Sequence, residues 1–397
     1  MIEHQVAIIG AGISGSLAAL ELTDAGFDVA LIDACGEPMM GASRWNEGKI
    51  HLGYCYLGDP SFHTPALMLD GAAAFIESIE RWTGRTLKED WFTQPVVYIV
   101  DPDTQFPADQ LWARSQRLAN LLVERAGAEP SLRRFVDGLP VLASMKSDDA
   151  ATATGLGRIA AAWQTSECCV APGPVAGLIR EALQARQIPV HRAAARTLSQ
   201  LANGWRIGAE IGDICARAII NASWESRTLL DRQVVASREP CSIRFKYALF
   251  GSGLKAVTKL APSTRIIGRF GDVTPYGNGE AYLSWYPDGL AGVSDDGRPP
   301  VPVEPELDTL IARTLAGLGL GRDLLEEPTA AWEVRGGYVV AHGSGDIDRA
   351  TSPLHYRNRL GAFELAPGYI SVDTGKYSCG PMVASHAAGL IARRLTT

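Results

Sequence analysis

No stretch of this sequence approaches the ~20 consecutive apolar residues that a helix needs to cross a bilayer. The sequence also lacks an excess of basic residues, since its formal net charge at pH 7 is −7, and we expect no nucleic-acid partner. A strand-like pattern begins already at Val6, so no signal peptide is indicated at the N-terminus. These absences favour a cytoplasmic protein.

The spacing of the cysteines does not indicate pairing. The seven cysteines are an odd number and include no C-x-x-C pair, which argues against a disulfide framework or a zinc site. Reduced thiols in the core and no metal are therefore expected. Hydrophobic content of 46% and charged content of 20% are those of an ordinary globular protein, and 397 residues suggest two or three domains.

The richest motif lies at the N-terminus. An apolar run from Val6 to Ile9 leads directly into Gly10-x-Gly12-x-x-Gly15, and a helical pattern follows. In such a motif the first glycine permits a tight turn, the second lets a pyrophosphate approach the backbone, and the third lets helix and strand pack closely. The N–H groups of the first helical turn, around Ile13 and Ser14, would then face the phosphates.

A second strand, residues 28–32, ends in Asp33 about twenty residues after the glycines. An acid at this position accepts hydrogen bonds from ribose hydroxyls, so Asp33 and the adjacent Ala34 are predicted to contact an adenosine. The order of strand, glycines, helix, strand and acid predicts dinucleotide binding. It does not distinguish FAD from NAD, and an NAD-only dehydrogenase stays open as an alternative.

The segment 41–54 is dense in small, polar and basic residues and has little periodicity, which favours a loop around a polar ligand. With the N-terminal motif, this loop resembles the D-amino-acid-oxidase-like superfamily of FAD-dependent oxidoreductases, which includes glycine and sarcosine oxidases, glycerol-3-phosphate dehydrogenases and L-2-hydroxyglutarate dehydrogenases. In the last of these the loop reads approximately N-S-G-V-I-H-A-G. The matching positions here are Asn46, Gly48, Ile50, His51 and Gly53, whereas Glu47 and Lys49 depart from the pattern.

The resemblance implies non-covalent FAD, because residues 343–355, where some relatives carry an attachment cysteine, contain none. It also implies that the loop runs beneath the flavin ring and along the pyrophosphate. The loop residues expected to contact the cofactor are Ser43, Arg44, Asn46, Gly48, Lys49 and Ile50.

The expected fold class is α/β, with a Rossmann-like FAD-binding domain and a second, mainly antiparallel-sheet substrate domain. We assign residues 1–83, 166–227 and 332–397 to the discontinuous FAD-binding domain, and residues 84–165 and 228–331 to the substrate domain. Asn203-Gly204 between two apolar runs is a strong hairpin signal. The strand after it ends in Asn221-Ala222, and the resemblance implies that Ala222 reaches the FAD.

The C-terminal segment resembles the closing unit of this superfamily. Residues 368–373 read as a strand, a loop follows, and Pro381 is well suited to the first position of a helix that extends to Arg394. By the family's arrangement the N–H groups of this helix would stabilise anionic reduced flavin, although a plain packing helix is the alternative. The contacts expected here are Gly375, Lys376, Gly380, Pro381 and Met382.

Four residues are candidates for catalysis. Lys49 and His51 are two apart, so on an extended segment both face the same side. Lys49 would place positive charge beside the ring, and His51 would act as a base toward the substrate. Their structural alternative is a core histidine and a Lys49–Glu47 pair. Arg335 or Arg357 would hold a substrate carboxylate, unless both are solvated surface charges.

The resulting hypothesis is an FAD-dependent oxidoreductase that oxidises a C–H next to an amine or hydroxyl by hydride transfer to flavin. An amino acid, a secondary amine or a 2-hydroxy acid is the expected small-molecule substrate, and dioxygen or another acceptor takes the electrons. Two alternatives stay open. One is a 2-hydroxy-acid dehydrogenase that uses a non-oxygen acceptor, and the other is a non-catalytic FAD-binding protein.

Overall fold

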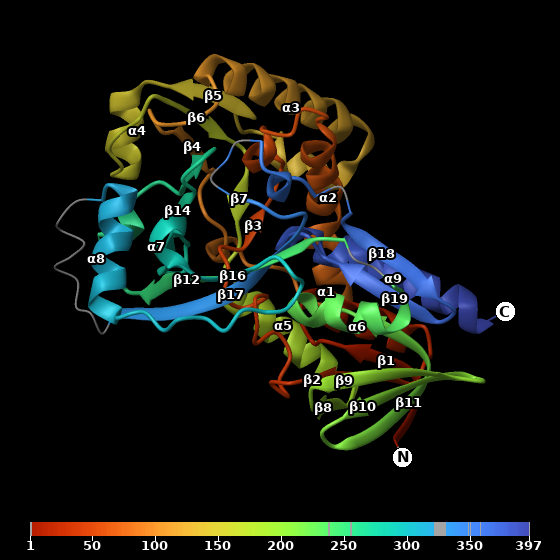
Figure 1. Ribbon diagram of the computed structural model, residues 1–397. Coiled ribbons are helices and arrows are strands. Elements are labelled where there is room, and N and C mark those ends of the chain that lie inside the picture. The colour runs from red at the N-terminus through yellow and green to blue at the C-terminus, as the bar shows by residue number, and fades with distance from the viewer. Residues whose placement is uncertain are drawn as a thin grey trace.

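The computed structural model describes residues 2–236, 239–254, 256–320, 331–347, 349, 351–357 and 359–396. Asn358 and the end of the expected substrate domain, residues 321–330, lie outside this range. The described residues form an eight-stranded sheet, a nine-stranded sheet and a two-stranded sheet. Figure 1 shows the first sheet at the lower right near the N-terminus and the second toward the left, beside α4 (Ser147–Thr154) and α8 (Leu307–Leu318).

The eight-stranded sheet has the order β18-β19-β11-β1-β2-β8, with β9 and β10 as an added hairpin. Its parallel strands are β1 (Ile2–Ile9), β2 (Val29–Asp33), β8 (Val190–Arg192), β11 (Gly212–Asn221) and β19 (Tyr369–Asp373). Antiparallel strands complete it, namely β9 (Ala195–Leu201), β10 (Gly204–Ala209) and β18 (Gly361–Ala366). The second half of β1 is fully buried, as expected for a parallel strand covered on both faces.

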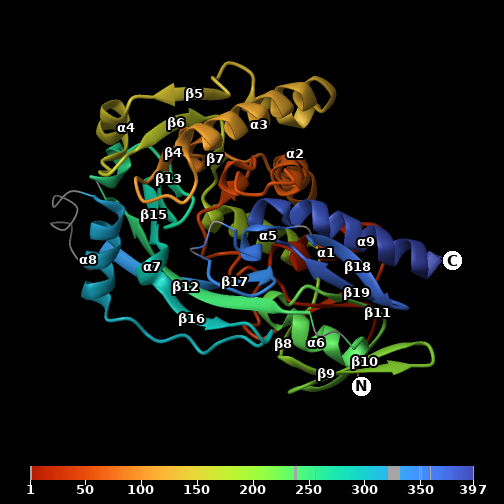
Figure 2. The ribbon, with the colours of Figure 1, turned by 45° about the horizontal axis from the view of Figure 1, so that its top comes forward.

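Helices cover this sheet where the sequence predicts them. The glycine turn leads into α1 (Ile13–Asp24), whose residues are buried up to Leu22 except for Glu21. The helix is buried because it packs against α9 (Gly380–Thr396), α5 (Pro172–Ala185) and α2 (His63–Thr83). Figure 2 shows α9 running toward the C-terminus beside β18 and β19. The expected Rossmann-like fold is therefore confirmed.

The nine-stranded sheet has the order β16-β12-β15-β14-β13-β4-β6-β5, with β17 also paired to β12. Its strands are β4 (Val97–Val100), β5 (Leu142–Met145), β6 (Ala161–Thr165), β12 (Cys241–Ser252), β13 (Ser263–Ile266), β14 (Gly271–Pro275), β15 (Glu280–Trp285), β16 (Leu290–Ser294) and β17 (Trp332–His342). All neighbours are antiparallel except β13 and β4, which run parallel. The second sheet is thus mainly antiparallel, as expected.

One expected boundary differs from the topology. The sequence analysis assigns residues from 332 onward to the cofactor domain, yet β17 pairs with β12 from Trp332 to Ala341. The reason is that β17 is a long strand whose pairing register with β12 is not visible in its own residue pattern. We propose that the third segment of the cofactor domain begins after β17 and that the other boundaries stay as assigned.

Short connecting elements complete the structure. The two-stranded sheet joins β3 (Lys49–Ile50) to β7 (Cys168–Cys169) in antiparallel register. The long helix α3 (Ala108–Ala128) packs beside α2 at the top of Figure 2, while α6 (Arg227–Val234) and α7 (Tyr286–Gly289) are short. All seven cysteines are free thiols. Within the described ranges, no helix combines the length and apolar character needed to span a membrane.

Candidate active site

A cavity of about 400 Å³ extends from the turn between β1 and α1 to the strands of the second sheet. At one end it is lined by Gly12 and Asp33, at the carboxyl edge of the parallel strands. At the other end Lys246 and Asp272, from β12 and β14, form part of its wall. Ligands of open α/β sheets bind at this edge, so the position fits a dinucleotide.

The three glycines of the N-terminal motif have distinct structural roles. Gly10 has φ +97°, and a side chain there would collide with the carbonyl oxygen of Ala222. A side chain on Gly15 would collide with the carbonyl oxygen of Gly10, so this glycine permits close packing of strand and helix. Gly12 has φ −71°, and a Cβ there would meet only the Ser43 Oγ at 3.0 Å. Its missing side chain therefore leaves space in the cavity without being required by the fold.

Asp33 closes the opposite side of this end. Its Oδ2 accepts a hydrogen bond from the N–H of Ala11 at 2.8 Å, and its Oδ1 accepts one from the N–H of Cys35 at 2.8 Å. Glu225 lines the same end, and burial together with the charge of Asp33 raises its pKa to about 7. Two acidic groups thus face this part of the cavity, which suits hydroxyl donors such as those of a ribose.

Most of the residues predicted from the sequence meet at this cavity. Those that line it are Gly10, Gly12, Ile13, Ser14, Asp33, Ala34, Ser43, Asn46, Lys49, His51, Ala222, Arg357, Gly375 and Lys376. Others do not line it, and these are Gly15, Arg44, Gly48, Ile50, Gly380, Pro381 and Met382. At Gly48, which has φ +61°, a side chain would strike the carbonyl of Val170.

Arg335 is not brought to the cavity. It lies on β17, its side chain is 50% exposed, and it forms an ion pair with Glu333. Its guanidinium also stacks 5.3 Å from the ring centre of Trp45, which separates it from the interior. Arg44 stacks on Trp45 as well, at 4.6 Å. This geometry favours the surface-charge alternative for Arg335 over the carboxylate clamp.

Lys49 is buried in an ion pair rather than left as a free charge. Its Nζ lies 2.9 Å from Asp272 Oδ1 and also donates to the hydroxyl of Thr264. Burial alone would lower the pKa of Lys49, but Asp272 and other acidic neighbours raise it well above its usual value. The partner expected from the sequence, Glu47, does not pair with it. The ion pair joins the cofactor loop to strand β14.

His51 faces the cavity as a neutral imidazole. Burial and the positive charges of Lys376, Lys49 and Arg357 hold its pKa well below the usual value. Its Nε2 lies 3.8 Å from Glu47 Oε1, and its buried Nδ1 has no hydrogen-bond partner among the described residues. A neutral histidine with a free ring nitrogen can accept a proton.

Several cavity residues were not found by sequence reasoning, and the most notable are Arg244, Lys246 and Tyr56. Arg244 is 2% exposed, and its Nε and Nη1 have no hydrogen-bond partner in the described structure. The sequence does carry a signal for two of them. Arg244 and Lys246 are two apart in an otherwise apolar strand pattern, which places both cations on one face.

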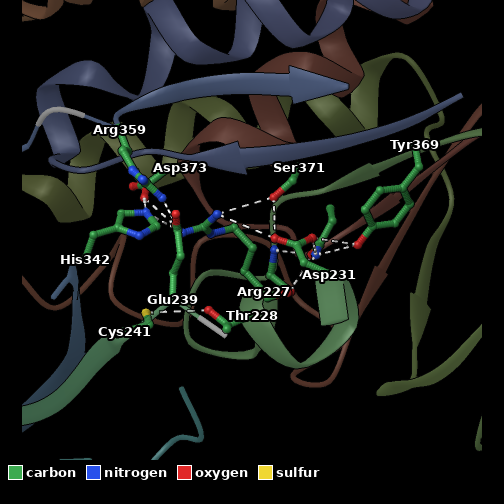
Figure 3. A network of polar contacts seen from close by, with 12 residues as sticks. Arg227, Thr228, Asp231, Glu239, Cys241, His342, Arg359, Tyr369, Ser371 and Asp373 are labelled. Carbon is green, nitrogen blue, oxygen red and sulfur yellow. Dashed lines mark hydrogen bonds and ion pairs between the residues drawn. The ribbon is translucent and has the colours of Figure 1, made fainter. Parts of the chain in front are cut away.

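A buried polar network, drawn in Figure 3, supports the loop at the C-terminal side of the cavity. Asp373 Oδ2 accepts hydrogen bonds from Arg227 Nη2 at 2.9 Å and from His342 Nε2 at 2.8 Å. Its Oδ1 accepts from the backbone N–H of Gly375 at 3.0 Å. Because Gly375 lines the cavity, the network fixes the backbone of this loop from behind.

A second anchor lies beneath the loop of residues 48–52. Glu167 is fully buried, and its Oε2 accepts the N–H of Leu52 at 2.6 Å while Oε1 accepts the hydroxyl of Tyr98. Ligand atoms of His51, Cys55 and Glu167 lie within 4.8 Å of one another, as in a metal site. However, Lys49 Nζ lies 4.0 Å from Cys55 Sγ, and both carboxylate oxygens of Glu167 are engaged. These contacts favour a structural role for Glu167 over a cation-binding site.

The cavity fits FAD by its own geometry. One end has a glycine turn with free space and hydroxyl groups, the acids lie beside it, and unpaired buried donors lie at the far end. Cations predominate at that far end, as Lys376 and Arg357 show. A negatively charged ring system and an acidic substrate are the ligands that this charge distribution favours.

The sequence matches the family described as FAD dependent oxidoreductase (DAO) over residues 5–349. No curated protein sequence matches the chain. Among solved structures, it is similar to glycine oxidase from Geobacillus kaustophilus, with a TM-score of 0.69, 16% identity, and coverage of 99% of this chain and 96% of that one. It is also similar to iminodiacetate oxidase from Chelativorans sp. BNC1, with a TM-score of 0.67, 15% identity, and coverage of 98% of this chain and 95% of that one.

The dithionite-reduced L-alpha-glycerophosphate oxidase from Mycoplasma pneumoniae, solved with FAD bound, gives a TM-score of 0.64 at 12% identity and covers 99% of this chain and 95% of that one. These structural likenesses establish a shared fold, and the family match extends over most of the sequence. The fold, the cavity and the match agree. The chain therefore belongs to the family of FAD-dependent oxidoreductases, and it is an enzyme that uses FAD.

Proposed function

We propose that this enzyme oxidises the C–H bond next to an amine or hydroxyl group in a small organic acid. The observation that carries the proposal is the group of unpaired buried donors at the far end of the cavity, including Arg244 and Arg357. A buried guanidinium without a partner is unfavourable unless a ligand supplies the counter-charge. A carboxylate is the group that guanidinium geometry matches best.

Bound FAD would supply the hydride acceptor for the substrate carbon, and the product would be an imine or a ketone. The chain supplies position and proton transfer. The arginines would hold the carboxylate so that the adjacent carbon lies against the ring. His51 would take the proton from the amine or hydroxyl through its unpaired Nδ1, because its low pKa keeps the imidazole neutral.

The cofactor-binding role of the chain is proposed along the length of the cavity. Gly12, Ser14 and Ser43 would contact the pyrophosphate, and Asp33 the ribose. At the ring, Lys376 would supply positive charge near the start of α9, while the helix itself begins at Gly380 behind the cavity wall. Asp272 neutralises Lys49, so Lys49 contributes to the ring only as one half of an ion pair.

The names of the similar structures support the substrate class without specifying it. They are oxidases of glycine, iminodiacetate and glycerophosphate, which are all small polar molecules with an acidic group. Amino acids, secondary amines and 2-hydroxy acids therefore form the set to test. Dioxygen or another acceptor would reoxidise the flavin.

The test is an anaerobic screen of purified holoenzyme against amino acids, secondary amines and 2-hydroxy acids, with loss of flavin absorbance as the readout. We expect at least one of these compounds to bleach the flavin. If none does, while dithionite reduces the same sample, the proposed oxidation is wrong. Peroxide formation under air then separates an oxidase from a dehydrogenase that uses another acceptor.

Non-covalent binding of the flavin is tested on the same sample by acid precipitation. Cys55 lines the cavity, but burial raises the pKa of its thiol to about 11, so it is not a ready nucleophile. We expect the flavin to appear in the supernatant. Flavin that stays with the precipitated protein would mean that it is covalently attached.

A further inference from the structure

Two arginines in the cavity are buried and form no ion pair within the described part of the chain. Arg244, on β12, is 2% exposed and has unpaired Nε and Nη1 atoms. Arg357, between β17 and β18, is 8% exposed; its Nε is unpaired, and its Nη1 donates to the carbonyls of Leu354 and Tyr356. These carbonyls orient the guanidinium of Arg357. The nearby acid, Asp373, is hydrogen-bonded to Arg227 and His342 instead.

The two guanidinium groups also repel each other. Burial lowers the pKa of Arg244 and the nearby positive charge of Arg357 lowers it further, although Tyr286, Asp295 and Tyr56 act in the opposite direction. Burial and both arginines likewise hold the pKa of His355 at about 4, so that histidine stays neutral. Two like charges packed into one buried cavity are costly in the absence of a ligand. An anion in the cavity would remove the cost.

Each arginine has a tyrosine beside it, and the two pairs come from different elements. The Arg244 guanidinium lies 5.8 Å from the ring centre of Tyr286, in α7. The Arg357 guanidinium lies 5.8 Å from the ring centre of Tyr56, in the short helix after the cofactor loop. Both tyrosine hydroxyls are buried and have no hydrogen-bond partner among the described residues. Each pair therefore offers charged and neutral donors to one acidic group.

FAD does not account for this charge. Its phosphates would lie at the glycine turn, where backbone N–H groups and the hydroxyls of Ser14 and Ser43 are available. Negative charge on the ring would find Lys376 at the loop that lines the cavity. Lys49 and Lys246 share Asp272, since both lower its pKa, to about 2, although burial would raise it. Arg244 and Arg357 are the cations left for a substrate.

We infer that the substrate is a dicarboxylate, with one carboxylate held by Arg244 and Tyr286 and the other by Arg357 and Tyr56. The amine- or hydroxyl-bearing carbon would then lie between the two pairs, within reach of His51. This inference rests on the proposed oxidation, but the charge matching that it describes can be measured without turnover.

The first experiment uses holoenzyme and ligands that cannot be oxidised at such a carbon. Glutarate and pentanoate have the same chain length and differ in one carboxylate, and each is titrated while the flavin absorbance spectrum is recorded. We expect glutarate to bind at least about tenfold more tightly than pentanoate, because its second carboxylate accepts at least one additional charge-assisted hydrogen bond. Equal affinities would overturn the inference.

Substitutions of the two arginines then show whether they bind two carboxylates at separate subsites or one carboxylate together. Arg244→Gln and Arg357→Gln should each weaken glutarate binding by about tenfold or more, and only one of them should weaken pentanoate binding. If both weaken pentanoate equally, the arginines hold one carboxylate together and the inference fails. Arg313→Gln, on α8 with a side chain that is 67% exposed, is the matched control and should change neither affinity. The wild-type comparison stands even if a variant folds poorly.

Turnover distinguishes this inference from the proposed function. If diacids reduce the flavin with a higher kcat/KM than monoacids of matched length, the proposed oxidation and the dicarboxylate assignment are both supported. If monoacids are equally good, the dicarboxylate assignment fails and the oxidation stands. If glutarate shows the expected preference but no amine or hydroxy acid reduces the flavin, the proposed oxidation fails and the double anion site stands. A preference for glycerol 3-phosphate over glutarate would replace the second carboxylate by a phosphate and overturn the assignment.

Discussion

Lys49 Nζ lies 2.9 Å from the carboxylate of Asp272, and this contact links the loop that lines the cofactor cavity to the centre of the second sheet. The side chain of Lys49 is 2% exposed and that of Asp272 is 12% exposed. A pair buried to this extent adds little net stability when intact, but the loss of one partner leaves an uncompensated charge in the interior. Single substitutions in this pair should therefore lower the free energy of unfolding more than the double substitution does.

We expect Lys49→Met and Asp272→Asn each to lower the free energy of unfolding by about 3–5 kcal/mol. The double variant should regain part of that loss, because neither member of this ion pair is left without its partner, although Lys246 loses the carboxylate that it shares with Lys49. Urea unfolding of the apoprotein, followed by circular dichroism, measures all three. Additive losses in the double variant would mean that the two side chains do not act as a pair.

The same variants should shift the flavin midpoint potential in opposite directions. Lys49→Met removes a positive charge near the ring and should lower the potential, whereas Asp272→Asn removes a negative charge and should raise it. The double variant should lie close to wild type. Spectroelectrochemical titration of the holoenzyme gives the values. Shifts of the same sign would show that the pair is too far from the ring to act by charge.

Gly12→Val should give folded protein with little FAD. The backbone of Gly12 is in an ordinary extended conformation, so valine is compatible with the fold, but its side chain would fill the space proposed for the pyrophosphate. The ratio of flavin to protein absorbance measures occupancy. Gly10→Val is the contrasting variant and should misfold, because Gly10 has φ +97° and contacts Ala222. Full occupancy in Gly12→Val would mean that the phosphates lie elsewhere.

His51→Ala should slow anaerobic flavin reduction by about 10²- to 10⁴-fold, the usual effect of losing a general base. In wild type, the base is lost only when pH falls through the lowered pKa of His51, so reduction should stay fast well below pH 6.5. Stopped-flow absorbance across pH measures both effects. His386→Ala, at an exposed position of α9, is the matched control. A rate within threefold of wild type would assign His51 a structural role.

His355 should make the apoprotein acid-sensitive. Native His355 stays neutral down to about pH 4, while the unfolded chain takes up the proton near pH 6.5. The folded state should therefore lose stability as pH falls between these values, by up to about 3 kcal/mol. His355→Gln should lose correspondingly less between pH 7.5 and 4.5 in urea unfolding. Equal losses in both proteins would show that His355 does not titrate in this way.

The cofactor half of the protein could be predicted from the sequence because its signals are local. The glycine motif, the acid at Asp33 and the hairpin at Asn203-Gly204 each specify a conformation within a few residues. The structure has α1, β2 and the hairpin of β9 and β10 where these signals indicate. FAD use follows from the family match as well.

The second sheet was predicted less completely, since several of its strands carry polar residues in the interior. In β13, Ser263, Thr264 and Arg265 are all buried, and this pattern does not read as a core strand. Strands β5 and β6 and helix α4 were not predicted as elements. Their signals depend on partners far away in the chain, which a single sequence does not reveal.

The substrate end of the cavity shows the same limit. His51 and Arg357 were found because they lie in motifs or cationic clusters, but Arg335 was chosen on the same grounds and lies outside the cavity. Arg244 was missed although Lys246 follows it at a spacing of two, because the strand pattern alone does not show which of its faces lines a cavity. Whether an arginine faces solvent or a cavity depends on strand pairing, and here β12 pairs with both β16 and β17.

The buried anchors around the loop of residues 48–52 restrict how a substrate can enter. Glu167 accepts the N–H of Leu52, Lys49 pairs with Asp272, and β3 pairs with β7, so this loop is fastened to β14 of the nine-stranded sheet and to β7. A hinge motion that parted the two domains would have to break a buried ion pair and strand pairing together. Substrate entry and product release should therefore depend on movements of surface side chains and short loops. The cofactor and substrate domains should not part from each other.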